Sequence, residues 1–259
     1  MRREQSQQRR PVESPSLREK KTPAGSLFLI GVPIGHPDDI TIRALSILSR
    51  VDVIATEDPI ATQELLRHHS LSAVLTSYGP TRIKEKVAVL LDRLQQGASI
   101  ALVSDCGSPV ISDPGSLLVA AAHKHSVPVC SIPGPSAVTA AIAASGFPAE
   151  AFHFYGEITT ATGPQQRRLI RILTHTEPTI FFCTTESCPA ILNVIARTAP
   201  RRKIALACNL TLEQETILRG AARHIAERLK RIRPPQAITM IVAGEQPTGR
   251  KTAANRSRN

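Results

Sequence analysis

Residues 103–115, with the sequence VSDCGSPVISDPG, carry the most information about the fold of this chain. The segment follows an apolar run at 100–103 and precedes an apolar helical pattern at 116–125, so we interpret it as a loop between a strand and a helix. In open α/β sheets such loops bind ligands, because glycine permits close approach to the backbone and proline fixes the loop's shape. The spacing alone equally allows a tight turn in which Asp113 caps the helix.

On both sides of this loop, short apolar runs alternate with longer segments of helical periodicity. The predicted strands of the first half are 27–32, 51–55, 100–103 and 127–130, and its clearest helices lie around 40–48 and 87–94. The second half repeats the pattern, with strands at 179–183, 203–207 and 237–242 and helices at 164–174, 188–197 and 219–231. This alternation predicts an α/β fold with mostly parallel sheets covered by helices.

The chain of 259 residues is long enough for two modest domains. Its halves are joined by 132–137, IPGPSA, where two prolines and a glycine exclude a regular element. Ser136 is the expected N-cap of the Ala-rich helix that follows. We therefore expect an N-terminal α/β domain over 25–134 and a C-terminal α/β domain over 135–245.

Most of the formal charge of +11 lies at the two ends of the chain. Residues 1–24 carry seven Lys or Arg and three Glu, and residues 246–259 carry four Lys or Arg and no acid, so each end contributes +4. Such composition predicts disordered basic tails. They either tether RNA phosphates or only aid solubility, and composition does not separate these functions.

The five cysteines are scattered and odd in number, which is atypical of a secreted disulfide framework. None has partners at zinc-finger spacing, so the cysteines predict no metal site. The N-terminus lacks the apolar stretch of a signal peptide, and no apolar run approaches the roughly 20 residues that span a bilayer. We expect a cytoplasmic protein with no membrane partner.

A second loop, 31–39 with the sequence GVPIGHPDD, follows the first predicted strand. It lacks both the G-x-G-x-x-G spacing of dinucleotide folds and the lysine of a P-loop, so neither NAD nor ATP is indicated. Asp38 and Asp39 either line a cleft or cap the helix that is predicted to begin at Ile40.

Several motifs in one order resemble those of the ribosomal small-subunit RNA methyltransferase I family. They are VPIG at 32–35, DITIRAL at 39–45, Glu57-Asp58, the long motif within 103–115, and IPGPSA at 132–137. The resemblance covers about residues 26–245, and the segment ending in ISDPG is its most specific part. It implies a tetrapyrrole-methylase fold, in which S-adenosylmethionine lies in a cleft between two α/β domains.

The resemblance also implies site residues and partners. The cofactor contacts it implies are Gly107, Ser108, Pro109 and Val110 after the fourth strand, and Pro133, Gly134, Ser136 and Ala137 at the entry to the second domain. Family members act as homodimers and methylate the 2′-hydroxyl of a cytidine in small-subunit ribosomal RNA, so a 30S-type subunit is the expected partner.

The chemistry of such a reaction limits what the protein must supply. The sulfonium of the cofactor already activates the methyl group, so the protein mainly positions the ribose oxygen behind it. A hydroxyl is a weak nucleophile, and a carboxylate acting as general base contributes roughly 10² to 10⁴-fold. Asp105 and Asp113 are the candidates, because they flank the predicted cofactor loop.

The chain departs from the family pattern at several polar positions. Pro59, Ile60 and Ala61 stand where the family commonly has Thr-Arg-His, and the basic loop after 153–156 is reduced. These losses remove RNA-contacting groups and leave the glycine-proline loops intact. Two alternatives therefore stay open: a methyltransferase for a tetrapyrrole or another small molecule, and a non-catalytic ribosome-binding protein.

Overall fold

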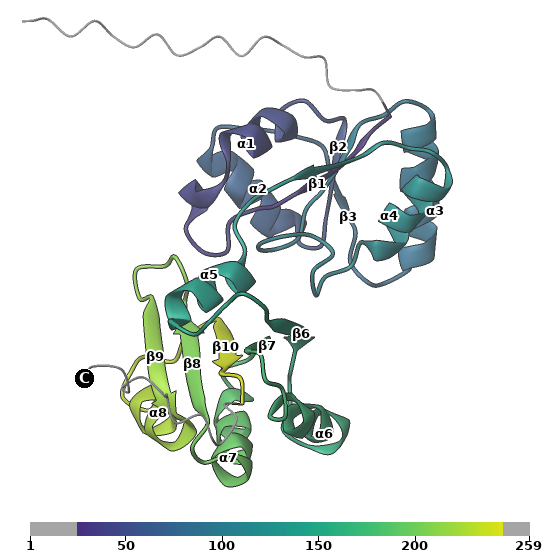
Figure 1. Cartoon of the computed structure of the whole chain (residues 1–259). Coiled ribbons are helices and arrows are strands. Elements are labelled where there is room, and N and C mark those ends of the chain that lie inside the picture. The colour runs from purple at the N-terminus through teal and green to yellow at the C-terminus, as the bar shows by residue number, and fades with distance from the viewer. Residues whose placement is uncertain (1–24, 246–259) are drawn as a thin grey trace, which may run out of the picture.

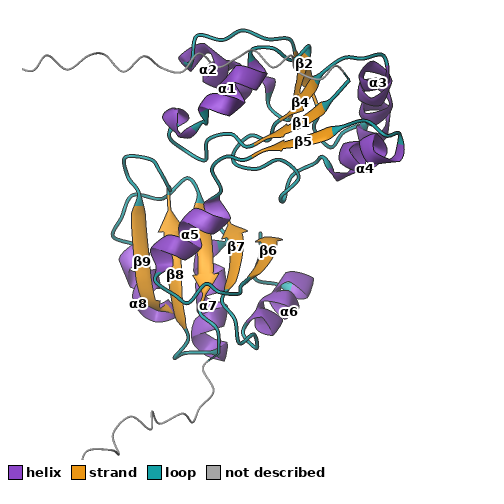
Figure 2. Cartoon of the chain, turned by 45° about the horizontal axis from the view of Figure 1, so that its top comes forward, coloured by secondary structure: helices purple, strands orange, loops and turns teal. Residues whose placement is uncertain are grey.

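A computed structural model of the chain describes residues 25–245. They form two five-stranded sheets, one in each half of the chain, with helices packed on both faces of each sheet (Figures 1 and 2). This architecture confirms the predicted α/β class. The two predicted basic tails, 1–24 and 246–259, lie outside the described residues.

The first sheet is entirely parallel and has the strand order β3-β2-β4-β1-β5. Its strands are β1 (Leu27–Ile30), β2 (Val53–Thr56), β3 (Leu75–Ser77), β4 (Ile100–Leu102) and β5 (Val129–Ile132). The helices α1 (Ile42–Leu48) and α2 (Pro59–His68) cover one face, and α3 (Ile83–Gln95) and α4 (Ser116–Lys124) cover the other (Figure 2). Because every strand runs in the same direction, the loops that follow β1, β2, β4 and β5 meet at one edge of the sheet.

Two aliphatic cores fill the faces of this sheet. Phe28, Ile30 and Ile54 pack with residues of α1 and α2 on one side. Leu27 and Ile100 pack with residues of α3 and α4 on the other, where Tyr78 is also fully buried. Strands that are buried on both faces require continuous apolar runs, and the central strands of this half have such runs.

The second sheet is mixed and has the order β6-β7-β10-β8-β9. Its strands are β6 (His153–Glu157), β7 (Thr179–Cys183), β8 (Lys203–Cys208), β9 (Thr216–Ala221) and β10 (Ile238–Val242). Only β6 and β7 pair in parallel, while β10 runs antiparallel to both its neighbours and β8 forms an antiparallel pair with β9. The expectation of mostly parallel pairing is therefore wrong for this half, because the short 209–215 connection joins β8 and β9 as a hairpin and β10 enters between β7 and β8 in the opposite direction.

Helices again cover both faces of the second sheet. Helix α5 (Ala137–Ser145) packs on one face against Ile180, Ala205 and Ile241. The other face carries α6 (Gly163–Ile172), α7 (Cys188–Thr198) and α8 (Ala222–Leu229). Among residues 25–245 there is no helix with the length and apolarity needed to cross a bilayer.

Two local predictions need correction, and a third is confirmed in its position. The helix predicted at 219–231 begins only at Ala222, because 216–221 pairs with β8 as an edge strand. Neither Asp38 nor Asp39 caps α1; the helix begins at Ile42, and the Thr41 hydroxyl accepts a hydrogen bond from the Ala44 N–H at 3.1 Å. Ser136 is the N-cap residue of α5, as predicted, although among the described residues its side chain makes no capping hydrogen bond.

Candidate active site

A cleft of about 750 Å³ lies between the two sheets, at the edge where the loops of the first sheet meet. Residues from both halves of the chain line it. The first half contributes Ile34, Cys106, Gly107, Ser108, Ile111, Ser112 and Asp113; the second contributes Ser136–Val138, Glu157, 182–186, Ala207, Leu210 and 234–239. Ligand sites for molecules of drug or cofactor size commonly have volumes of about 300 to 1,000 Å³, so this cleft is large enough for such a ligand.

The eight residues predicted to contact a cofactor divide into two groups. Gly107, Ser108, Ser136 and Ala137 line the cleft. The others lie beside it: Pro109 is buried, Val110 is half-buried, Pro133 is exposed, and Gly134 packs against the loop after β1. The structure thus brings four of the eight together around one space.

Gly134 packs directly against the backbone of Gly31, which leaves no room for a side chain at either position. A Cβ atom at Gly134 would lie 2.5 Å from the backbone oxygen of Gly31, and one at Gly31 would lie 2.8 Å from the Gly134 Cα. The Gly31 N–H donates to the Ile132 carbonyl at 3.0 Å. Two backbones therefore cross in contact at the point where the chain leaves the first sheet for the second.

The loop after β4 is held in an uncommon conformation. Gly107, Val110, Ser112 and Gly115 all have positive φ angles, of 77°, 75°, 68° and 148°. A positive φ is costly for a β-branched residue such as Val110, and such strain is typical of ligand-binding loops. The Ser104 hydroxyl donates to the carbonyls of Cys106 and Gly107, and Gly107 forms a β-bridge with Val32, so the loop is fixed before any ligand arrives.

Three carboxyl groups gather beside this loop: Glu57 after β2, and Asp105 and Asp113 after β4. Burial, and then the neighbouring charge of Asp105, raise the pKa of Asp113 to about 6. Burial, followed by the charges of Asp113 and Asp105, raises the pKa of Glu57 to about 7. Glu57 Oε1 is buried and has no hydrogen-bond partner among the described residues. A carboxyl group with a pKa near 6 or 7 can accept a proton at neutral pH.

The two predicted catalytic aspartates have different surroundings. Asp113 lines the cleft, and it does not cap α4: the N-cap is Gly115, and in the described structure no side chain caps that helix. Asp105 faces a neighbouring cavity of about 340 Å³, and its Oδ1 accepts a hydrogen bond from the Asp58 N–H at 3.0 Å. The alternative interpretation, in which Asp113 caps the following helix, is therefore wrong.

The carboxyl cluster predicts a measurable effect on stability for Glu57→Gln. Because folding raises the Glu57 pKa from 4.5 to about 7, ionisation of this group opposes folding as the pH rises through 7. Glutamine does not ionise, so the variant should melt at a higher temperature than the wild type at pH 8, and the difference should shrink towards pH 4.5. Thermal unfolding by circular dichroism measures this.

Glu64, which is exposed on α2, offers the matched control. Glu64→Gln should change the melting temperature little at either pH. If the melting temperatures of Glu57→Gln and wild type differ by the same amount at pH 4.5 and pH 8, folding does not raise the pKa of Glu57.

The second half supplies lining segments that the sequence did not predict. The Asn209 side-chain oxygen accepts hydrogen bonds from the N–H groups of Gln236 and Ala237, and the Thr185 hydroxyl donates to the Pro235 carbonyl. These contacts fix segments 184–186 and 234–239 as one wall of the cleft. Glu57 belongs to a sequence motif but had no predicted role; its position directly after a buried strand was the only available signal.

Comparisons with known proteins agree with this geometry. Residues 26–226 match the family model described as Tetrapyrrole (Corrin/Porphyrin) Methylases. The chain is 35% identical over 223 residues to Ribosomal RNA small subunit methyltransferase I of Thermotoga maritima. That alignment covers 86% of this chain and the whole length of the relative. It is 37% identical over 225 residues to the protein of the same name from Micromonospora olivasterospora, and this alignment covers 85% of this chain and 71% of the relative.

A solved structure shares the fold. Uroporphyrin-III C-methyl transferase from Thermus thermophilus, complexed with S-adenosylhomocysteine, matches with a TM-score of 0.58 and 19% identity over 84% of this chain and 97% of that one.

Proposed function

Because the chain belongs to the tetrapyrrole methylase family, and within it to ribosomal RNA small subunit methyltransferase I, we propose that it methylates the 2′-hydroxyl of a cytidine ribose in small-subunit ribosomal RNA. The chain is a methyltransferase that uses S-adenosylmethionine. The observation that carries the proposal is the cleft between the two halves, which brings predicted cofactor residues and a carboxyl group of raised pKa to one space.

The cleft fits the cofactor in size and in chemistry. A Cβ atom at Gly107 would be in ordinary van der Waals contact with Ile34 Cγ2 at 3.4 Å and the Pro135 oxygen at 3.8 Å, and Gly107 lines the cleft, so without a side chain its backbone is open to close approach by a ligand. Gly107, Ser108, Ser136 and Ala137 would hold S-adenosylmethionine, whose sulfonium supplies an activated methyl group. The remaining four predicted contacts, Pro109, Val110, Pro133 and Gly134, would shape this pocket from behind.

In this proposal Asp113 accepts the proton of the ribose hydroxyl while that oxygen takes up the methyl group. Its position in the cleft and its pKa of about 6 suit a general base at neutral pH. Asp105 acts on the reaction through Asp113, because its charge raises the pKa of that neighbour and its hydrogen bond to Asp58 keeps it in place.

Methyl transfer to purified 30S-type subunits tests the proposed substrate. We expect label from S-adenosylmethionine to enter one cytidine, whose neighbouring phosphodiester then resists alkaline hydrolysis. Label entering a base, or a tetrapyrrole in place of RNA, would reject the ribose assignment. Cofactor binding without turnover on subunits, subunit RNA or tetrapyrroles would support a member of the family that has lost activity.

The basic tails give a further prediction for an RNA substrate. Removing 1–24 and 246–259 deletes eleven Lys and Arg residues, so KM for the subunit should rise by about tenfold with kcat little changed, because phosphate contacts mainly supply affinity. Steady-state kinetics at two salt concentrations measure this. As a control, a chain with these eleven residues replaced by glutamine keeps the tail length and should behave like the truncation. An unchanged KM in both would mean that the tails only aid solubility.

We also propose that the chain acts as a homodimer in the cytoplasm, where ribosomal subunits are its partner. Large apolar side chains outside the cleft that are available to such an interface are exposed at Ile42 (77%), Ile60 (72%) and Leu117 (50%). Apolar surface of this kind favours association when it is contiguous.

A further inference from the structure

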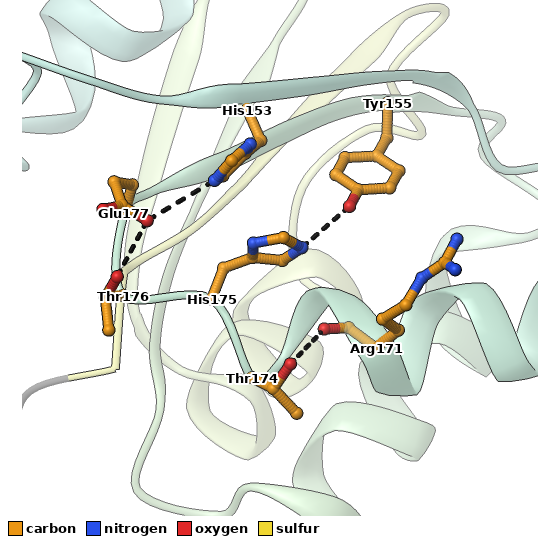
Figure 3. A network of polar contacts seen from close by, with 7 residues as sticks. All are labelled: His153, Tyr155, Arg171, Thr174, His175, Thr176 and Glu177. Carbon is orange, nitrogen blue, oxygen red and sulfur yellow. Dashed lines mark hydrogen bonds and ion pairs between the residues drawn. The ribbon is translucent and has the colours of Figure 1, made fainter.

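A second group of titratable side chains lies where β6 begins and the loop between α6 and β7 ends (Figure 3). His153 is the first residue of β6, and His175 and Glu177 lie in the loop before β7. Each offers one ligand atom, and these atoms lie within 4.8 Å of one another. We propose that His153, His175 and Glu177 form a binding site for a divalent transition metal ion, best matched by Zn²⁺.

The geometry is close to that of a zinc site. Bonds of about 2.0 to 2.1 Å in a tetrahedral site place ligand atoms about 3.3 Å apart. His153 Nε2 and Glu177 Oε2 are already 3.4 Å apart, and the remaining separations of up to 4.8 Å close by about 1.5 Å at most, which side-chain rotation supplies. Two imidazoles and one carboxylate suit Zn²⁺ and leave a fourth position for water.

Tyr155 orients one of the imidazoles. Its hydroxyl lies 2.7 Å from His175 Nε2, so His175 can donate its Nε2 proton there and leave Nδ1 free. Figure 3 shows Nδ1 on the side of the ring that faces His153 and Glu177. Metal-binding histidines generally have such a partner on the second ring nitrogen, because it fixes the tautomer and the ring orientation.

The other ligands are also prepared for a cation. The Thr176 hydroxyl donates to Glu177 Oε2 at 2.8 Å, and this bond lowers the pKa of Glu177. Burial, and then the neighbouring His153, lower the pKa of His175, which favours the neutral imidazole that metals require. The side chains of His153 and Glu177 are 41% and 43% exposed, so an ion can enter from solvent.

A metal here would stabilise an edge of the second sheet. β6 is an edge strand that pairs only with β7 among the described strands, and its register shifts between Phe154 and Glu157. The loop carrying His175 also accepts a hydrogen bond from the Glu245 N–H at 2.7 Å, next to the end of the described chain. The ion would join β6 to this loop, and through the loop to the final described segment. The proposed role of the ion is therefore structural, away from the cleft.

Another group, Asp38, His68 and His69, provides a matched control. Its atoms also lie within 4.8 Å, with His69 Nε2 3.0 Å from the Pro37 carbonyl and His68 2.7 Å from Asp38. The side chains of His68 and Asp38 are more exposed than those of the proposed site, at 47% and 65%, so water competes more strongly there and we expect it to bind metal more weakly.

Competition between the full-length protein and a zinc-chelating dye tests the site. We expect one tight Zn²⁺ per chain and a rise in melting temperature on adding Zn²⁺. His153→Asn, His175→Asn and Glu177→Gln should each weaken binding by about tenfold or more, and Tyr155→Phe should weaken it by a smaller factor. His68→Asn and Cys106→Ser should leave the tight site unchanged.

Circular dichroism without metal establishes whether each variant is folded. If a histidine variant does not fold, Glu177→Gln still tests the site, because glutamine preserves the size of the side chain. Equal Zn²⁺ affinity in wild type and in the folded variants would overturn the proposal. Loss of binding in His68→Asn or Cys106→Ser alone would place the ion elsewhere and overturn it as well.

Discussion

Replacing Asp113 by asparagine is expected to lower kcat for methyl transfer by about 10² to 10⁴-fold while leaving the affinity for S-adenosylmethionine nearly unchanged. The reason is that asparagine keeps the size of the side chain but cannot accept the proton of the ribose hydroxyl. In the wild type, kcat should rise with pH through about 6, as the Asp113 carboxyl ionises, and then level off. Single-turnover rates across pH 5 to 8 measure both effects, and the variant should lack this step.

Asp105→Asn is the matched comparison, because Asp105 lies on the same loop but faces the smaller cavity. Removing its charge should lower the pKa of Asp113 and shift the pH step of kcat downwards, with a smaller loss of rate. If Asp105→Asn abolishes the reaction and Asp113→Asn does not, the proton acceptor is Asp105, the other predicted aspartate.

Gly107→Val is expected to weaken binding of S-adenosylmethionine by about 100-fold or more. The valine side chain would take up space beside the proposed cofactor, because Gly107 lines the cleft. Isothermal titration gives the affinity directly, and circular dichroism shows whether the variant is folded.

Gly97→Val separates the loss of space from the cost of the backbone conformation. Gly97 also has a positive φ, of 97°, and among the described residues no atom outside its chain neighbours lies within 4 Å of a Cβ placed there. The substitution therefore introduces similar strain away from the cleft. It should lower the melting temperature about as much as Gly107→Val while leaving cofactor affinity intact. Normal affinity in Gly107→Val would remove this loop from the cofactor site.

The strands that the sequence predicted are mainly the central ones. Within the predicted runs 203–207 and 237–242, residues 204–207 and 238–242 are buried, so these runs are mostly apolar and easily recognised. The three strands that were missed, β3, β6 and β9, are all edge strands whose side chains are mostly half-buried or exposed. The last three residues of β9, 219–221, were predicted as part of a helix because the strong helical pattern of 222–229 follows them directly.

The site was predictable where backbone conformation depends on residue type. The glycines and prolines of 103–115 and 132–137 are sufficient to predict the loops at the cleft. The wall formed by 184–186 and 234–239 was not predictable, because it depends on hydrogen bonds between segments far apart in the chain. The raised pKa of Glu57 likewise arises from burial and from two aspartates more than forty residues away.

The placement of the two tyrosines gives the protein one optical reporter in each half. The chain has no tryptophan, so its intrinsic fluorescence comes from Tyr78 and Tyr155 alone. Tyr78 is fully sealed inside the first half, whereas Tyr155 touches His175 in the second. A change in emission when Zn²⁺ is added, with Tyr155→Phe as the blank, would therefore report on the β6 edge without any attached dye.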